Sequence, residues 1–279
     1  MNNSINLKYI DLVKKSVSAS LYEESTWKKL DVTSSKSQSP FAYIRKTIRN
    51  RFIKFAAKNS VYLVKADPRK VNQSQKGGFW PLFGYSMAGL PRLNNTQWCM
   101  EQAIMGNVPG DFIETGAWRG GMVILMRAVL EAYNVKDRKV WVADSFEGMP
   151  KPKNSSDGWD LSSISYLNVS LEDVKQNFEK FGLLDEQVHF LKGWFCDTLP
   201  YAPIEKIAVL RLDGDLYSST MDALKSLYHK VSNGGFVIVD DYNSWPACRA
   251  AVSDFLHDIG ESPVIEKIDE EAVFWKVNR

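Results

Sequence analysis

Two short apolar segments of the chain end in carboxylates, and these acids are the residues best suited to chemistry. The segments are residues 207–212 and 235–239, and the acids that follow them are Asp213, Asp215, Asp240 and Asp241. Carboxylates that converge repel one another unless a cation lies between them, and hard divalent ions such as Mg²⁺ take oxygen ligands of this kind. The alternative is that Asp240 and Asp241 only cap a loop. Two acidic clusters at the ends of consecutive strands favour a metal site over that alternative.

The elements around these acids form a strand–helix–strand unit. Short β-branched and aliphatic runs bounded by turn residues are typical of strands buried on both faces. Residues 219–231 between them have helical spacing, and Asn233-Gly234-Gly235 predicts the end of that helix. The two strands are therefore expected to be parallel, with both sets of acids at the C-terminal edge of the sheet, where ligands bind.

A glycine-containing loop upstream is a second candidate for ligand binding. Residues 111–115 predict the first strand of the core, and residues 116–121 (GAWRGG) follow it before an apolar helix at 122–133. Such a loop lets a ligand approach the backbone, and N–H groups at the start of the helix can hold an anionic group. The spacing differs from the GxGxxG pattern of dinucleotide sites.

Asp144 ends the next predicted strand, at residues 139–146. An acid at this position can accept hydrogen bonds from both ribose hydroxyls of a nucleoside ligand. The alternative, a cap for the following loop, has about equal weight when the residue is considered alone. The long polar loop at 147–165 follows the C-terminal end of a strand, so we expect it to border the site.

The remaining elements complete an α/β fold. Helices are predicted at 94–105, 170–181 and 247–259, a third early strand at 187–192, and a closing hairpin at 263–268 and 272–277. The expected architecture is a doubly wound, mostly parallel sheet with an antiparallel C-terminal hairpin.

Residues 1–75 differ from the rest and predict a helical or irregular N-terminal extension before a domain at 76–279. Residues 41–58 have the pattern of a basic amphipathic helix, which can lie on an anionic membrane or pack on protein, either its own domain or a sister subunit. Packing on protein is favoured. Residues 77–87, rich in glycine and aromatic residues, are either a mobile lid or an irregular covering segment.

Composition excludes several classes of protein and partner. The net charge of +2 gives no reason to expect a nucleic-acid partner, and no apolar run approaches the roughly 18 residues of a transmembrane helix. The three cysteines are scattered without a CxxC pair, which argues against a disulfide framework or a zinc site. The N-terminal sequence also lacks the apolar region of a secretory signal, so we expect a cytoplasmic protein.

Five segments in this order resemble the macrocin O-methyltransferase family. They are residues 114–121 (ETGAWRGG), 144–150 (DSFEGMP), 193–199 (GWFCDTL), 212–217 (LDGDLY) and 240–242 (DDY). The resemblance covers residues 80–279 and implies a class I methyltransferase (Rossmann-like) fold, S-adenosylmethionine (SAM) as methyl donor, and Mg²⁺. It also implies a hydroxylated small-molecule acceptor, such as a sugar or a glycosylated natural product, and favours a homodimer or larger oligomer.

The resemblance further implies roles for single residues. Those expected near SAM are Glu114, Thr115 and Gly116 at the methionine part, Asp144 with Ser145 at the ribose, and Gly193 with Trp194 at the adenine. Those expected at the metal are Asp213, Asp240 and Asp241, with Asp215 as general base. A divalent ion lowers the pKa of a bound hydroxyl, and a nearby carboxylate can then take its proton. A vicinal diol could chelate the ion, which would select sugars or catechols.

Three rival functions explain fewer of these residues. An NAD-dependent dehydrogenase would need GxGxxG and a Tyr/Lys or His catalytic pair, and the sequence has neither. A metal-dependent hydrolase would leave the glycine loop and Asp144 unexplained. The main alternative is a non-catalytic adaptor that binds a membrane or a partner through the basic N-terminal helix, and retention of all four acids argues against it.

Overall fold

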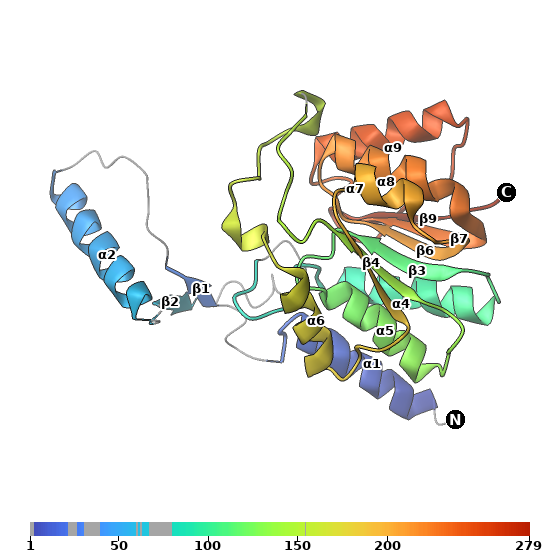
Figure 1. The fold of residues 1–279 in the computed structure, drawn as a ribbon, viewed down its shortest axis with the longest axis horizontal. Helices are drawn as coiled ribbons and strands as arrows, with labels where there is room; N and C mark the ends of the chain where they lie inside the picture. The colour runs from blue at the N-terminus through green and yellow to red at the C-terminus, as the bar shows by residue number, and fades with distance from the viewer. Residues whose placement is uncertain are drawn as a thin grey trace.

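The body of the molecule is a seven-stranded sheet covered by helices on both faces (Figure 1). The structure is a computed structural model of the 279-residue chain, and it describes residues 3–21, 27–30, 40–59, 61, 63–66, 80–153 and 155–279. The strand order is β5-β4-β3-β6-β7-β9-β8. The class I α/β fold expected from the sequence is confirmed.

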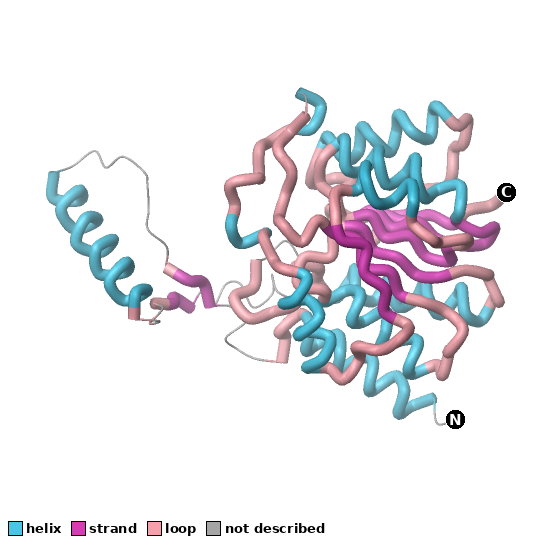
Figure 2. The backbone as a smooth tube through the Cα atoms, in the orientation of Figure 1, coloured by secondary structure: helices cyan, strands magenta, loops and turns pink. Residues whose placement is uncertain are grey.

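Five parallel strands form the centre of the sheet (Figure 2). They are β3 (Asp111–Thr115), β4 (Val140–Asp144), β5 (Val188–Lys192), β6 (Ile207–Leu212) and β7 (Val231–Val239). The chain changes direction across the sheet between β3 and β6, which is where ligands bind in open parallel sheets. The predicted C-terminal hairpin is confirmed, because β8 (Glu266–Lys267) and β9 (Val273–Lys276) add to β7 as antiparallel strands.

Alternating side chains of the strands divide the core into two layers. In β3, Phe112 packs into the cluster on one face and Ile113 into the cluster on the other, as the two-residue period of a strand requires. The first face is covered by α1 (Asn3–Val17), α4 (Leu90–Met105), α5 (Gly121–Ala132) and α6 (Leu171–Lys180). The second face is covered by α8 (Tyr217–Leu227) and α9 (Pro246–Asp258), with the short α7 (Phe195–Thr198) at its edge.

The N-terminal region contributes to this core through α1. Ile10, Val13 and Val17 are buried in the first cluster, and the side chain of Asn6 donates a hydrogen bond to Ala132 O at 2.5 Å. Burial of this apolar stripe against α5 is what fixes α1 on the sheet domain. The division of the chain at about residue 75 stays a prediction.

The basic helix predicted at 41–58 is present as α2 (Pro40–Lys58). Figure 1 shows it standing away from the body, next to a two-stranded ribbon formed by β1 (Trp27–Lys29) and β2 (Val64–Ala66). Its apolar stripe is exposed, from 56% at Ile44 to 67% at Phe55. Packing on its own domain is therefore not seen for this stripe. None of the described helices is long and apolar enough to cross a membrane.

Two predicted boundaries are wrong, and local chemistry explains both. Helix α4 begins at Leu90 rather than residue 94, because Pro91 fits the first turn of a helix, where its missing N–H costs nothing. Helix α8 ends at Leu227, and Val231 already pairs with Ile207 in the sheet. The Asn233-Gly234 segment therefore lies in β7, where Gly234 has a φ of +84° and the register with β6 shifts.

Candidate active site

The acids that end β6 and β7 meet at the C-terminal edge of the sheet. Parallel pairing places Leu212 opposite Val239, so the residues that follow both strands emerge side by side. One carboxylate oxygen from each of Asp213, Asp240 and Asp241 lies within 4.8 Å of the others. This is the juxtaposition that the strand–helix–strand pattern predicts.

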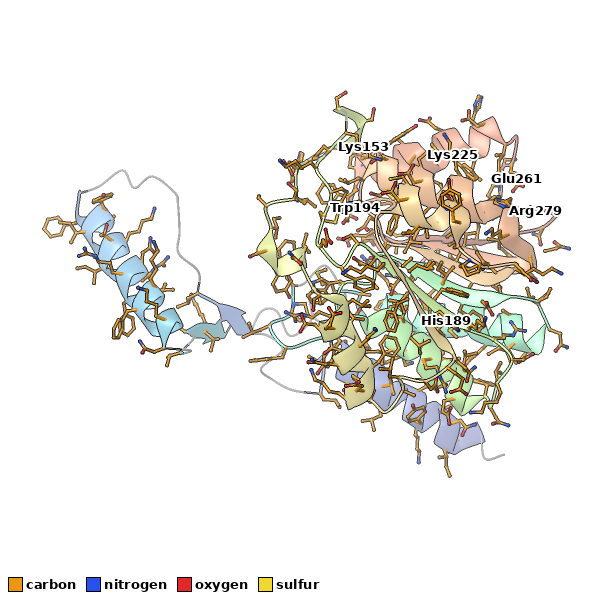
Figure 3. All side chains as sticks on the ribbon, in the orientation of Figure 1. Lys153, His189, Trp194, Lys225, Glu261 and Arg279 are labelled. Atoms are coloured by element: carbon orange, nitrogen blue, oxygen red, sulfur yellow. The ribbon has the colours of Figure 1, made fainter. Side chains whose placement is uncertain are left out.

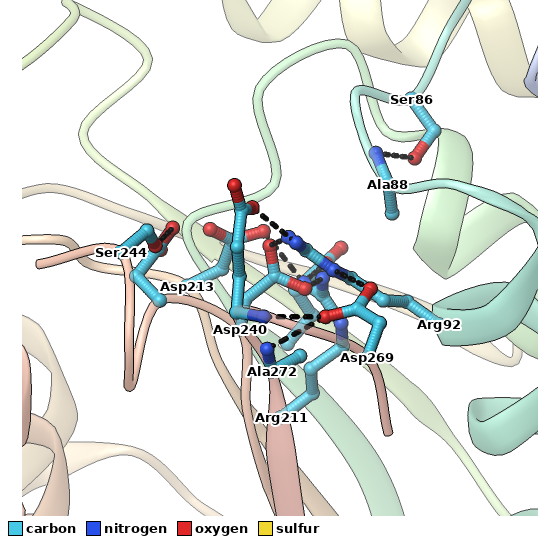
Figure 4. A network of polar contacts seen from close by, with 12 residues as sticks. Ser86, Ala88, Arg92, Arg211, Asp213, Asp240, Ser244, Asp269 and Ala272 are labelled. Atoms are coloured by element: carbon cyan, nitrogen blue, oxygen red, sulfur yellow. Dashed lines mark hydrogen bonds and ion pairs between the residues drawn. The ribbon is translucent and has the colours of Figure 1, made fainter. Parts of the chain in front are cut away.

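A buried arginine in β6 ties three of the surrounding carboxylates together (Figure 4). Arg211 is 1% exposed, and its Nη1 donates to Asp213 Oδ2 at 2.6 Å and to Glu114 Oε1. Its Nη2 donates to Asp240 Oδ1. A charged residue in an otherwise apolar buried strand is unusual, so Arg211 could have been recognised in the sequence as a partner for buried acids.

A second buried arginine binds Asp240 from the opposite side. Arg92 of α4 donates from Nη1 to Asp240 Oδ2 at 2.6 Å and from Nε to Asp269 Oδ2 at 2.8 Å, and it also pairs with Glu271. Both oxygens of Asp240 are thus held by guanidinium groups (Figure 4). Because each carboxylate oxygen has two lone pairs, Asp240 can still offer one to a metal.

The cluster carries more acid than its two arginines balance. Burial raises the pKa of Asp215 to about 7, with the charge of Asp213 adding to the effect. Burial and the charges of Asp215, Asp213 and Asp240 raise the pKa of Asp241 well above its usual range. Asp241 Oδ2 is also buried and accepts no hydrogen bond from the described residues. An excess of buried carboxylates with an unused oxygen fits a hard divalent cation such as Mg²⁺.

Asp215 occupies a backbone conformation that few side chains adopt. It follows Gly214 with a φ of 54°, in the left-handed region that asparagine and aspartate tolerate better than most residues. Trp118 and Phe146, with φ of 47° and 56°, lie in the loops that follow the neighbouring strands. Strained residues that gather at one edge of a sheet are typical of functional sites. Asp215 also lines two cavities at this edge of the sheet.

The first cavity, of about 370 Å³, opens beside the ends of β3, β4 and β5. Five residues predicted to bind the cofactor line it: Gly116, Asp144, Ser145, Gly193 and Trp194. Lys153, from the long loop after β4, lines the same cavity as Trp194, and both side chains are labelled in Figure 3. The structure therefore brings these distant motifs around one space of ligand size.

Asp144 also has a structural role in this cavity. Its Oδ2 accepts hydrogen bonds from the N–H groups of Ala117 and Trp118 at 2.8 and 3.1 Å, and its Oδ1 accepts one from Phe146 at 2.8 Å. Two of these bonds cap the glycine loop, and the bond from Phe146 caps the loop after β4, as the loop-cap alternative states. It still faces the cavity, and its contact with a ribose stays a prediction.

Glycine is required at position 116 because the loops after β3 and β6 approach each other closely there. Its φ is +93°, and a Cβ there would lie 1.8 Å from the carbonyl oxygen of Asp213. Only glycine lets the loop after β3 pass this close to the loop after β6. Thr115, by contrast, is 1% exposed, lines neither of these two cavities and has its hydroxyl 3.5 Å from Arg211 O. Its place near the methionine part of SAM stays a prediction.

The second cavity, of about 220 Å³, joins the glycine loop to the acid cluster. Its polar wall includes Glu114, Arg92, Asp213, Asp215, Asp240 and Asp241. Glu114 is 2% exposed, and burial raises its pKa to about 8 although Arg211 lies beside it. Its Oε2 accepts no hydrogen bond from the described residues. A buried carboxylate oxygen of this kind suits a cationic ligand group.

Residues 80–89 form the cover of the second cavity. They are irregular, and Trp80 stacks on Tyr166 with 5.1 Å between ring centroids and 4° between planes. The guanidinium of Arg119 lies 4.3 Å from the ring of Trp118 and donates to Gly84 O at 2.9 Å. These contacts fit the covering-segment alternative. Residues 77–79, the glycine-rich start of the predicted segment, lie outside the described residues.

The residues that hold the acids in place were not predicted from the sequence. Arg92 lies in the first turn of α4, and its partners Asp269 and Glu271 lie in the turn of the C-terminal hairpin. Nothing in either local pattern links them, because their contact depends on how α4 packs over β7. Arg211 is the exception, because a charged residue in an apolar strand indicates a partner for buried acids.

The family model described as Macrocin-O-methyltransferase (TylF) matches residues 6–277. The match is wider than the resemblance at residues 80–279 and includes most of α1. It agrees with the burial of α1 in the core of the sheet domain.

Two relatives and one solved structure that are similar to this chain are named as O-methyltransferases. The 8-demethyl-8-(2,3-dimethoxy-alpha-L-rhamnosyl)-tetracenomycin-C 4'-O-methyltransferase of Streptomyces olivaceus is 51% identical over 216 residues, 76% of this chain and 80% of the relative. Mycinamicin III 3''-O-methyltransferase of Micromonospora griseorubida is 47% identical over 209 residues, 72% of this chain and 82% of the relative. The solved structure of the O-methyltransferase NovP is 40% identical with a TM-score of 0.79, and the match covers 98% of this chain and 100% of that one.

Proposed function

Because the chain belongs to the macrocin O-methyltransferase family, we propose that it transfers the methyl group of SAM to a sugar hydroxyl of a glycosylated natural product, with Mg²⁺ as cofactor. The observation that carries this proposal is the pair of cavities that share Gly116, Asp213 and Asp215. The first has the apolar and aromatic lining that a nucleoside needs. The second has the carboxylates that a metal and a hydroxyl acceptor need.

The donor would lie across both cavities. Its adenosine part fits the first, with the adenine at Gly193 and Trp194 and the ribose at Asp144 and Ser145. The unpaired Oε2 of Glu114 suits the ammonium of the methionine part. The sulfonium would then lie near Gly116, where the two cavities join. SAM itself supplies the electrophilic methyl group.

The acid cluster provides what an alcohol lacks as a nucleophile. Asp213, Asp240 and Asp241 would hold Mg²⁺, which as a Lewis acid lowers the pKa of a hydroxyl bound beside it. Asp215, which follows Gly214 and lines both cavities, would accept the hydroxyl proton. Arg92 and Arg211 fix the orientation of Asp240, and the cover at residues 80–89 limits access of water to the reacting groups.

Names of the relatives support a sugar as the acceptor and leave its position open. One name describes transfer to the 4' position of a rhamnosyl compound, and another to a 3'' position. Chelation by two neighbouring sugar oxygens would be compatible with either position. Family membership therefore supports the reaction type and does not choose the hydroxyl.

Incubation with SAM and a glycoside should test the proposed reaction and its metal together. We expect methylated product with 4-methylumbelliferyl α-L-rhamnoside, measured by mass spectrometry. EDTA should abolish turnover and excess Mg²⁺ should restore it, because the carboxylates alone cannot lower the pKa of the hydroxyl. Full activity in excess EDTA would contradict the metal role.

Binding of the methyl donor should depend on Asp144. Replacing it with alanine removes the acceptor of three backbone hydrogen bonds as well as the proposed ribose contact. Hydrogen bonds to a charged group are worth roughly 1.5–3 kcal/mol, so we expect S-adenosylhomocysteine to bind about 10–100-fold more weakly in calorimetry. Tight binding of NAD with no response to SAM would contradict the donor assignment.

The exposed stripe of α2 supports the predicted homo-oligomer. Because this stripe does not pack on its own domain, we propose that the same helix packs on a sister subunit. We expect light scattering to give a dimer or larger oligomer that dissociates in Phe52→Ser/Phe55→Ser, while Val264→Ser, an exposed apolar residue on the body, has no effect. Flotation with anionic liposomes that is lost in the double variant would instead assign the stripe to lipid.

A further inference from the structure

A third cavity, of about 580 Å³, lies on the outer side of Trp245 and has no part in the proposed chemistry. Ser244 and Trp245 line both it and the cavity that contains the acid cluster. We propose that this third cavity binds the apolar, planar aglycone of the glycosylated acceptor while the sugar lies at the acids. The inference rests on the proposed function and names the part of the acceptor that the protein recognises outside the sugar.

The walls of the cavity come from three segments that the fold brings together. The loop after β4 contributes residues 155–159, including the short helix η3 (Ser155–Asp157), which lies against α8 and α9 (Figure 1). Helix α8 contributes Tyr217 and the start of α9 contributes Ala247. A volume of this size is within the range of sites for small molecules, roughly 300–1,000 Å³.

A fully buried acid holds the loop in this position. Asp157 is 0% exposed, its Oδ2 accepts a hydrogen bond from Lys153 N at 2.6 Å, and its Oδ1 accepts one from Ser218 N at 2.7 Å. The loop is thereby fastened to the first turn of α8. Gly158, with a φ of +84°, then turns the chain against Ala247, which brings Trp159 to the rim. The cavity is therefore built into the fold.

The chemistry of the lining selects an apolar and flat ligand. Trp159 is 75% exposed and meets Trp245 edge-on, with 5.7 Å between ring centroids and 86° between planes. An exposed tryptophan face next to a second tryptophan offers a stacking surface for a planar group. Among the described residues that line this cavity, Asp254 alone has a charge, and its carboxylate already accepts a hydrogen bond from Tyr217 Oη at 2.9 Å. These described residues therefore give an anionic ligand no cationic partner.

Continuity with the acid cluster determines which part of an acceptor lies here. A sugar whose hydroxyl approaches Asp213 and Asp215 would have its remaining atoms directed along the wall formed by Ser244 and Trp245. The group attached to that sugar would then reach the face of Trp159. A glycoside with a planar aglycone should consequently bind in both cavities at once, and a glycoside with a small aglycone in one.

The test compares two rhamnosides that differ in the aglycone. Dissociation constants of 4-methylumbelliferyl and methyl α-L-rhamnoside are measured by calorimetry on protein loaded with S-adenosylhomocysteine and Mg²⁺. We expect the aryl glycoside to bind about tenfold more tightly, an effect of the size of one aromatic anchor. Trp159→Ala should remove most of this difference and leave the methyl glycoside unchanged. Trp159→Phe should retain it. Tyr201→Ala changes another exposed aromatic residue, which lies outside the three cavities, and should have no effect.

The outcomes separate this inference from the proposed function. Equal affinity for the two glycosides, or a loss in Trp159→Ala that is the same for both, would overturn the aglycone site and leave methyl transfer intact. Failure of both glycosides to bind, with S-adenosylhomocysteine bound normally, would contradict the sugar acceptor and the aglycone site together. A preference for the aryl glycoside that Trp159→Ala leaves unchanged would place the aglycone elsewhere.

Discussion

Substitution of Asp215 by asparagine should lower kcat by about 10²–10⁴-fold, the range expected when a general base is lost. Asparagine keeps the size and the left-handed backbone of this position, so the loop after β6 should be unchanged. It cannot accept a proton from the acceptor hydroxyl. The affinities for S-adenosylhomocysteine and Mg²⁺ should stay within about twofold of the wild-type values, which places the loss in the chemical step.

Two comparisons make the role of Asp215 specific. Asp240→Asn should raise the Mg²⁺ concentration needed for half-maximal activity, because it alters a residue of the proposed metal set. Single-turnover kinetics at saturating Mg²⁺ would then show slow methyl transfer in Asp215→Asn and faster transfer in Asp240→Asn. Loss of Mg²⁺ binding in Asp215→Asn would reassign that residue from base to metal ligand.

Those features of the fold that depend on local pattern could be predicted from the sequence. Strand β6 and the second half of β7 are short apolar runs followed by acids, and their parallel pairing follows from the helix between them. The N-cap of α6 is also local, since Ser170 accepts a hydrogen bond from Asp173 N. The end of α8 was misjudged because Asn233-Gly234 is equally able to stop a helix or to form an irregularity in a strand.

The parts of the candidate site that lie at the end of a strand or in the turn after it could be predicted from the sequence. Glu114 lies near the end of β3, Asp144 closes β4, and Asp213 and Asp240 directly follow β6 and β7, so their meeting follows from sheet topology. Arg92 of α4 could not be predicted as the partner of Asp240. The helical pattern of α4 does not show which of its side chains will pack over a given strand. The aglycone cavity was equally hidden, since its walls lie far apart in the chain and meet through Asp157.

Removal of Arg211, the buried guanidinium of the acid cluster, should have the largest effect on stability. Arg211→Met should lower the free energy of unfolding by about 3–5 kcal/mol, because removal of one member leaves buried carboxylates without compensation. Glu114 and Asp240, its two most buried partners, would lose their hydrogen bonds to it. For a protein of this size the change corresponds to a fall in melting temperature of about 6–20 °C. Thermal unfolding in EDTA measures it without help from a metal.

A second substitution distinguishes loss of charge balance from loss of packing. If the buried carboxyls left without Arg211 are the cause, Glu114→Gln added to Arg211→Met should recover part of the lost stability, since it removes an acid that must either stay charged or take up a proton in the core. If poor packing of methionine is the cause, the double variant should be no more stable than Arg211→Met. Lys225→Met, at an exposed position of α8, should change stability by no more than about 0.5 kcal/mol and serves as the control. Recovery in the double variant would show that Arg211 stabilises the fold by balancing these acids, which are too buried to be solvated by water.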